Sequence, residues 1–184
     1  MLAIESSGEK FGTLSGAGEL RLVGNATAEI NALPVERAAF SGRITGPGEL
    51  VVSGEGVQTF DGADCSGVRR LVLAGGVLAG TANFGGNDLT VIFEGGALDA
   101  ELSGIGTFTS EGKPKIFVHA IEAGEKYVRK LISAEAIDEA AKTAFAEPEY
   151  SLAEGAKAKR ANMRVDDKAI SLTVRIPGLF ISIR

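Results

Sequence analysis

The feature that most constrains the fold is a repeat of short apolar runs punctuated by glycines. Residues 12–24 read GTLSGAGELRLVG and residues 42–54 read GRITGPGELVVSG, so six positions carry the same residue at an offset of 30. A third, weaker copy, LSGIGTF, begins at Leu102. Self-similarity at a fixed offset of roughly 20 to 50 residues is typical of solenoids and related arrays. The repeat therefore favours a stack of similar coils.

The composition of the repeat indicates strands joined by tight corners. Glycine adopts a positive φ at little steric cost, so the glycine pairs suit abrupt turns. The runs between them, at 20–23, 50–52, 71–73 and 89–93, are short and rich in β-branched residues, as strands are. The links are too short for crossover helices, which disfavours a doubly wound α/β fold and leaves an antiparallel sandwich as the other arrangement. The long repeat favours an all-β, right-handed parallel β-helix, a single-stranded solenoid.

The distribution of glycine and charge divides the chain near Gly124. Of the 25 glycines, 23 lie at or before that residue, whereas 20 of the 43 charged residues lie in 125–184. We therefore expect a Gly-rich solenoid over 1–124 and a small C-terminal β-rich unit over 125–184. A solenoid must cover its terminal coil, or its edge pairs with other chains. The tail is expected to be that cap.

Within the tail, the pattern predicts one short helix and several strands. Ile137, Ala141 and Phe145 recur at helical spacing within residues 134–146, although no strong cap precedes them, and a loop is the alternative. The strands are expected at 163–165, 170–174 and 179–183, with turns at 166–168 and 177–178.

Residues 41–80, SGRITGPGELVVSGEGVQTFDGADCSGVRRLVLAGGVLAG, resemble an autotransporter-associated β-strand repeat. The positions that match the family pattern are Ser41, Gly42, Gly46, Gly48, Leu50, Gly54, Gly56, Thr59, Gly62, Ala63, Asp64, Gly67, Gly76 and Leu78. The departures are Arg69-Arg70, where the family has small polar residues, and Cys65, where threonine is common. The tail is similar to the end of such passenger regions at Gly124, Tyr127-Val128, Leu131-Ile132, Phe145, Tyr150 and 172–174.

This resemblance implies a secreted or surface-displayed bacterial β-helix with an adhesive or structural role, part of a larger passenger-like protein. A glycan or protein surface of a host or the environment is the partner it implies. Residues 1–11 contain neither a basic segment nor an apolar segment of a signal peptide. If the native protein is exported, we expect its signal peptide to have been removed.

Charge and apolar patterning exclude several partners. The net charge is −5 and no cluster of Lys and Arg dominates, so nucleic acid is not expected as a partner. No apolar run reaches the roughly 18 residues of a membrane span. The single cysteine, Cys65, excludes an internal disulfide.

Two isolated residues, His119 and Cys65, carry reactive side chains. His119 is the only histidine, and no Cys or His lies at ligand spacing from it, which favours a structural or surface role over a metal ligand or general base. Cys65 as a nucleophile would need a neighbouring base or a lowered pKa. Its basic neighbours in sequence are Arg69 and Arg70, so a buried small apolar role is expected instead.

An acidic pair offers the strongest alternative to a binding protein. Asp61 and Asp64 lie close together and, with Arg69 and Arg70, imitate the acidic and basic groups of a polysaccharide lyase site. Glycosidase chemistry needs two carboxyl groups roughly 5–9 Å apart across a sugar. A turn role for Asp64, accepting backbone N–H bonds, is the favoured interpretation.

The remaining motifs favour structural roles. Gly16-x-Gly18 and Gly46-x-Gly48 lack the third glycine and the following helix of a nucleotide fingerprint. Residues 25–27 match an N-glycosylation sequon, which has little weight in a bacterial chain. The basic run of Lys157, Lys159, Arg160 and Arg164 is expected to be a solvated loop.

We therefore assign no catalytic, cofactor-binding or metal-binding residue and expect a non-enzymatic structural or adhesive β-helix. A polysaccharide lyase or glycoside hydrolase on the same fold is the first alternative. A polymer-forming scaffold similar to the bactofilins is the second.

Overall fold

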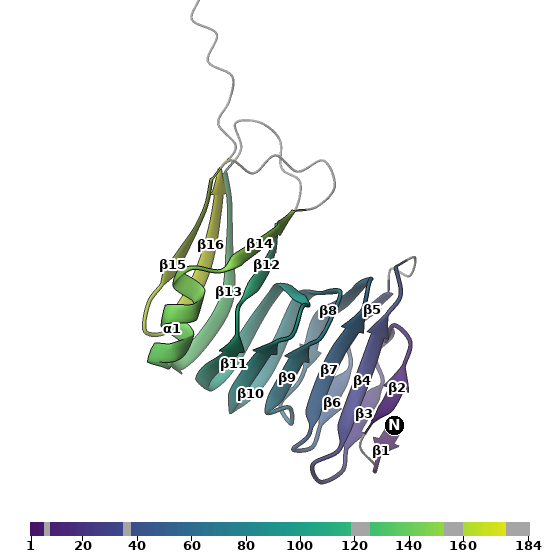
Figure 1. Ribbon diagram of the computed structural model, residues 1–184. Helices are drawn as coiled ribbons and strands as arrows, with labels where there is room; N and C mark the ends of the chain where they lie inside the picture. The colour runs from purple at the N-terminus through teal and green to yellow at the C-terminus, as the bar shows by residue number, and fades with distance from the viewer. Residues whose placement is uncertain (6–7, 35–37, 119–125, 153–159, 176–184) are drawn as a thin grey trace, which may run out of the picture.

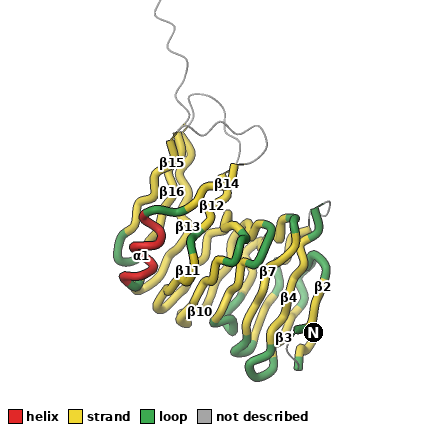
Figure 2. The backbone as a smooth tube through the Cα atoms, in the orientation of Figure 1, coloured by secondary structure: helices red, strands yellow, loops and turns green. Residues whose placement is uncertain are grey.

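The chain folds as a parallel β-solenoid of about six coils, which confirms the right-handed β-helix predicted from the sequence. The computed structural model describes residues 1–5, 8–34, 38–118, 126–152 and 160–175. Figure 1 shows the coils stacked from the N-terminal end, in purple, towards the green C-terminal elements. Strands account for most of the tube in Figure 2, and the described residues contain one helix.

Each coil contributes a strand segment to three faces, and the segments of each face pair in parallel with those of the neighbouring coils. Face 1 contains β1 (Leu2–Ile4), β3 (Glu19–Leu22), β6 (Arg43–Thr45) and β13 (Lys126–Ile137). Face 2 contains β5 (Ala38–Phe40), β12 (Lys115–Val118) and β14 (Glu149–Leu152). Face 3 contains β2 (Glu9–Phe11), β4 (Thr27–Ala32), β7 (Glu49–Gly54) and β9 (Arg70–Leu73). Three long strands bend through more than one face, namely β8 (Val57–Asp64), β10 (Val77–Phe93) and β11 (Ala97–Gly112).

The coil is about 20 residues long, shorter than the offset of the sequence repeat. Val77 pairs with Val57 in the preceding coil and with Ala97 in the following one. Leu20, by contrast, pairs with Ile44 on face 1, whereas its repeat counterpart Leu50 lies on face 3. The 30-residue offset therefore spans one full coil and one further face, and the two copies of the repeat do not stack on each other.

The predicted glycine corners are confirmed where face 3 turns into face 2. Gly54, Gly76 and Gly95 have φ values of 90°, 57° and 107°, in the left-handed region that favours glycine. A Cβ atom at Gly75 would lie 2.6 Å from the Gly54 carbonyl oxygen, and one at Gly96 would lie 2.7 Å from that of Gly75. The glycines therefore allow both the turn and the close stacking of one corner on the next.

The interior is filled by the alternate side chains of the three faces. In β7, Leu50 and Val52 point inward and are buried, whereas their neighbours are partly exposed. Aromatic rings stack along the axis as well, since Phe40 and Phe60 meet edge to face with centroids 6.1 Å apart. Gln58 is a buried polar side chain of this interior. Its carboxamide accepts from the Leu14 amide nitrogen at 2.8 Å and donates to the Leu14 carbonyl at 3.0 Å.

The solenoid continues into the C-terminal elements through β13. This strand pairs in parallel with β11, placing Ile132 beside Leu102, and in antiparallel with β16 (Ala169–Arg175). β15 (Arg160–Val165) completes a hairpin with β16. The predicted boundary at residue 124 falls among residues outside the structural description.

The helix α1 (Glu139–Ala146) lies at the C-terminal end of the stack (Figure 1). Its Phe145 ring is buried, with its centroid 5.9 Å from that of Phe93 and 5.8 Å from that of Phe108. The helix thereby covers apolar rings of the last coils.

The expectation that this helix lacks a strong cap, and extends back to residue 134, is wrong. Asp138 is the N-cap, and its carboxylate accepts from the Ala141 amide nitrogen at 2.7 Å. Residues 134–137 belong instead to the end of β13, where Ala134 and Ile137 pair with face residues of β11.

Two of the predicted tail strands are confirmed. β15 and β16 contain residues 163–165 and 170–174, and Asp166 closes the predicted turn by accepting from the amide nitrogens of Lys168 and Ala169. The strand predicted at 179–183 and the turn at 177–178 lie outside the described residues. None of the described residues form a helix with the length and hydropathy of a membrane span.

Candidate functional site

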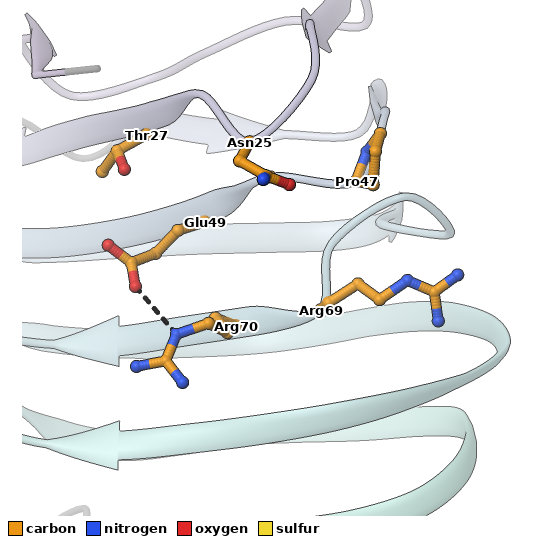
Figure 3. Close-up of a pocket in the computed structure, with 7 residues that line it drawn as sticks. Asn25, Thr27, Pro47, Glu49, Arg69 and Arg70 are labelled. Atoms are coloured by element: carbon orange, nitrogen blue, oxygen red, sulfur yellow. Dashed lines mark hydrogen bonds and ion pairs between the residues drawn. The ribbon is translucent and has the colours of Figure 1, made fainter.

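A hollow of about 300 Å³ lies where the chain turns from face 1 into face 3 (Figure 3). Three successive coils build it, and its lining includes Asn25, Thr27, Pro47, Glu49, Arg69 and Arg70. The hollow is open to solvent on the outer side of the solenoid. It brings together side chains from two of the sequence motifs, the 25–27 sequon and the Arg69-Arg70 departure from the family pattern.

Strand register explains why these residues meet. On face 3, Thr27 pairs with Glu49, and Glu49 pairs with Arg70, so the three side chains form one outward row across three coils. The residues that follow them, Ala28, Leu50 and Leu71, are buried. Because successive side chains of a strand point to opposite faces, burying the second row turns the first towards solvent.

The hollow carries more positive than negative charge. Arg70 donates from Nε to the Glu49 carboxylate at 3.1 Å, the contact drawn in Figure 3, and its Nη1 lies 3.9 Å from Glu111. Arg69 is exposed, and within the described part of the chain it forms no ion pair. The lining thus contains two guanidinium groups and one carboxylate, on a chain whose net charge is −5.

The predicted acidic pair does not share a site with these arginines. Asp61 and Asp64 are both in β8, but Gly62, with φ 69°, turns the strand between them. Asp64 pairs with Arg43 of the preceding coil at 3.1 Å and accepts from the Ser66 amide nitrogen at 3.0 Å. The hydrogen bond from Ser66 is the main cause that lowers the pKa of Asp64, and Arg43 contributes further. The turn role expected for Asp64 is therefore confirmed.

Cys65 is buried in the interior, as expected. Burial raises the pKa of its thiol to about 12, and the charge of the adjacent Asp64 acts in the same direction. A nucleophilic cysteine requires the thiolate, which this environment disfavours. His119 lies outside the described residues.

The basic run of the tail is only partly described. Lys157, Lys159 and the side chain of Arg160 lie outside the description. Arg164 is 83 % exposed and lies 3.8 Å from Asp166, consistent with a solvated surface. Among the described residues, no group of three or more His, Cys, Asp or Glu side chains could hold a metal ion.

Sequence reasoning missed two polar groupings. It did not place Asn25, Thr27 and Glu49 beside the arginines, because the register that joins them depends on the coil length. It also missed an ion pair between Arg129 of β13 and Asp99 of β11, in which Asp99 is 2 % exposed. Arg129 also donates to the Gly80 carbonyl oxygen at 3.2 Å, so this pair fastens the C-terminal hairpin to the solenoid wall.

The hollow offers hydrogen-bond donors beside one carboxylate, Glu49, which is paired with Arg70. Asn25 contributes an amide and Thr27 a hydroxyl, and the arginines contribute planar N–H groups that match carboxylate geometry. Comparison of the chain with protein-family models, with curated proteins and with solved structures found no match. The chemistry of this surface must therefore be argued from its own residues.

Proposed function

We propose that this chain is a non-enzymatic structural and adhesive β-helix, secreted or displayed on a bacterial surface as part of a larger passenger-like protein. The observation that carries the proposal is that its outward charged side chains form ion pairs between neighbouring coils. Lys10 pairs with Glu29, and Arg70 with Glu49, each across neighbouring coils of face 3. Arg43 pairs with Asp64 in the same way across neighbouring coils. These side chains link coil to coil along a rod.

The fate of the lyase-like residues supports the same proposal. Of these four residues, Asp64 is paired with Arg43 and accepts from Ser66, and Arg70 is paired with Glu49, so this acid and this base lie in two separate ion pairs. The Cys65 thiol is buried with a raised pKa. These arrangements favour a surface that binds over one that performs acid–base chemistry.

The resemblance of residues 41–80 to autotransporter-associated repeats supports the bacterial surface. A rod of stacked coils also suits display, because each coil adds length and outward area without a new core. Labelling intact cells with an antibody against this chain tests the location. Labelling of intact cells is expected, and labelling only after lysis would contradict the surface assignment.

A polymer-forming scaffold is the second candidate. Among the described residues, β1 lies at one end of the sheet order and pairs with β3 alone, so its outer edge offers a place for a strand of a second chain. Light scattering across a range of protein concentrations distinguishes the two. A mass that grows with concentration supports the polymer, and a constant mass of one chain removes it.

A further inference from the structure

The hollow at the corner of faces 1 and 3 is lined by two arginines, one asparagine and one threonine, besides Glu49 and Pro47. We infer that it binds the carboxylate of an acidic saccharide, with Arg69 as the main contact and Asn25 and Thr27 bonding the neighbouring hydroxyl groups. The inference rests on the proposed adhesive function and names its ligand class.

Charge distribution identifies Arg69 as the residue that binds the acid. Arg70 is held by Glu49 at 3.1 Å and has Glu111 at 3.9 Å, so its charge is largely compensated. Arg69 is exposed beside it and forms no ion pair with any described residue. A guanidinium group presents its N–H donors in a planar fork that binds a carboxylate in bidentate fashion. In Figure 3 the Arg69 side chain extends away from the Arg70–Glu49 pair, on the side where Pro47 lies.

Asn25 and Thr27 supply the groups that a sugar ring requires. Among the hydrogen bonds of the described residues, none uses the side chain of Asn25 or Thr27, although both line the hollow. An amide and a hydroxyl each donate and accept, which matches the hydroxyl groups of a saccharide. Pro47 adds an apolar ring to the lining. A volume of about 300 Å³ lies at the lower end for ligand sites and suits a small saccharide unit.

The hollow is also built on rigid elements. Thr27, Glu49 and Arg70 stand in register on paired strands, over the buried residues Ala28 and Leu50. Strand pairing fixes the backbone of these three residues, and Asn25 and Arg69 lie in the turns just before β4 and β9, so the backbone of the hollow is preformed, which favours affinity. A ligand bound here would contact three coils at once.

The test is calorimetric titration of the whole chain with a galacturonate trisaccharide, and with galactose trisaccharide as its uncharged counterpart. We expect binding of the acid form alone, weakening as salt rises, because exposed charges are screened. Arg69→Ala should weaken binding about tenfold or more, since it removes a bidentate charged contact. Glu49→Gln should tighten binding about two- to threefold by releasing Arg70.

Arg21→Ala is the matched control, because Arg21 is an exposed arginine on face 1 outside the hollow. Three results would each overturn the inference. They are equal weakening by Arg21→Ala and Arg69→Ala, equal binding of the two trisaccharides, and no binding of the galacturonate trisaccharide. The proposed function fails separately: it fails if the galacturonate trisaccharide is cleaved during the titration, whatever Arg69 contributes to binding.

Discussion

The two copies of the sequence repeat provide a matched pair of glycines for testing how the coils stack. Gly16 and Gly46 occupy the same position of the repeat and have φ values of 87° and 90°. A Cβ atom at Gly16 would meet nothing within 4 Å, whereas one at Gly46 would lie 1.8 Å from the Leu22 carbonyl oxygen of the coil below. Replacing each by alanine therefore separates the cost of the backbone conformation from the cost of contact between coils.

The expected magnitudes differ by several kilocalories. At Gly16, the left-handed conformation costs alanine roughly 1–2 kcal/mol, and the stiffer unfolded chain returns about 0.4–1 kcal/mol, leaving a net loss of about 1 kcal/mol. At Gly46 the same loss applies, and the backbone must also move away from Leu22. Overpacking adds roughly 1–3 kcal/mol and a lost ladder hydrogen bond about 1 kcal/mol. We therefore expect Gly46→Ala to destabilise the chain by about 3–5 kcal/mol.

Urea unfolding followed by circular dichroism measures both variants, with the slope m checked for loss of cooperativity. Gly62→Ala is the control inside the stack, because Gly62 has φ 69° and open space around its Cβ position. It should behave like Gly16→Ala. Equal destabilisation by Gly46→Ala and Gly62→Ala would refute the stacking argument.

Three further predictions follow from the core, the thiol and one surface carboxylate. Phe145→Ala should lower the free energy of unfolding by about 3–5 kcal/mol, because the ring is buried against Phe93 and Phe108. A loss under about 1 kcal/mol would show that α1 does not cover the stack. Cys65 should resist Ellman's reagent in the folded chain and react once urea unfolds it, since burial raises the pKa of its thiol to about 12. Rapid labelling of the folded chain would contradict the burial of this thiol. Hydrogen bonds from Lys10 and Ser53 lower the pKa of Glu29 from 4.5, so its contribution to stability is present above that pH and is lost as pH falls through the lowered value. The free energy of unfolding of Glu29→Gln should therefore fall less on acidification than that of the parent, by less than about 1 kcal/mol because Lys10 is exposed. Equal shifts of the urea midpoints of the variant and the parent between neutral and acid pH would contradict this.

The strand-and-corner architecture was predictable because its determinants are local. The φ preference of glycine acts within one residue, and the strand preference of the apolar run at 50–52 acts within one strand. Asp138 was equally readable, since aspartate immediately before Glu139 is a favoured N-cap.

The pairing of coils was not predictable, because it depends on contacts between residues far apart in the chain. The repeat aligns Leu20 with Leu50, yet the structure places them on different faces. The lining of the hollow also depends on pairing between coils, because the coil length decides that Asn25 and Arg69 line the same hollow. Asp61 and Asp64 show the opposite case: they are close in sequence, but the turn at Gly62 separates the positions of their side chains.

We propose that the outward side chains of this solenoid link coils and bind a partner rather than perform chemistry. The most direct test incubates the whole chain with a panel of plant and host polysaccharides and follows new reducing ends and unsaturated products over time. We expect no more reducing ends or unsaturated products than a boiled sample gives, even with polymers that the chain binds. Product that accumulates in proportion to the amount of chain, and is lost in Asp64→Asn or Arg70→Ala variants that remain folded, would contradict it.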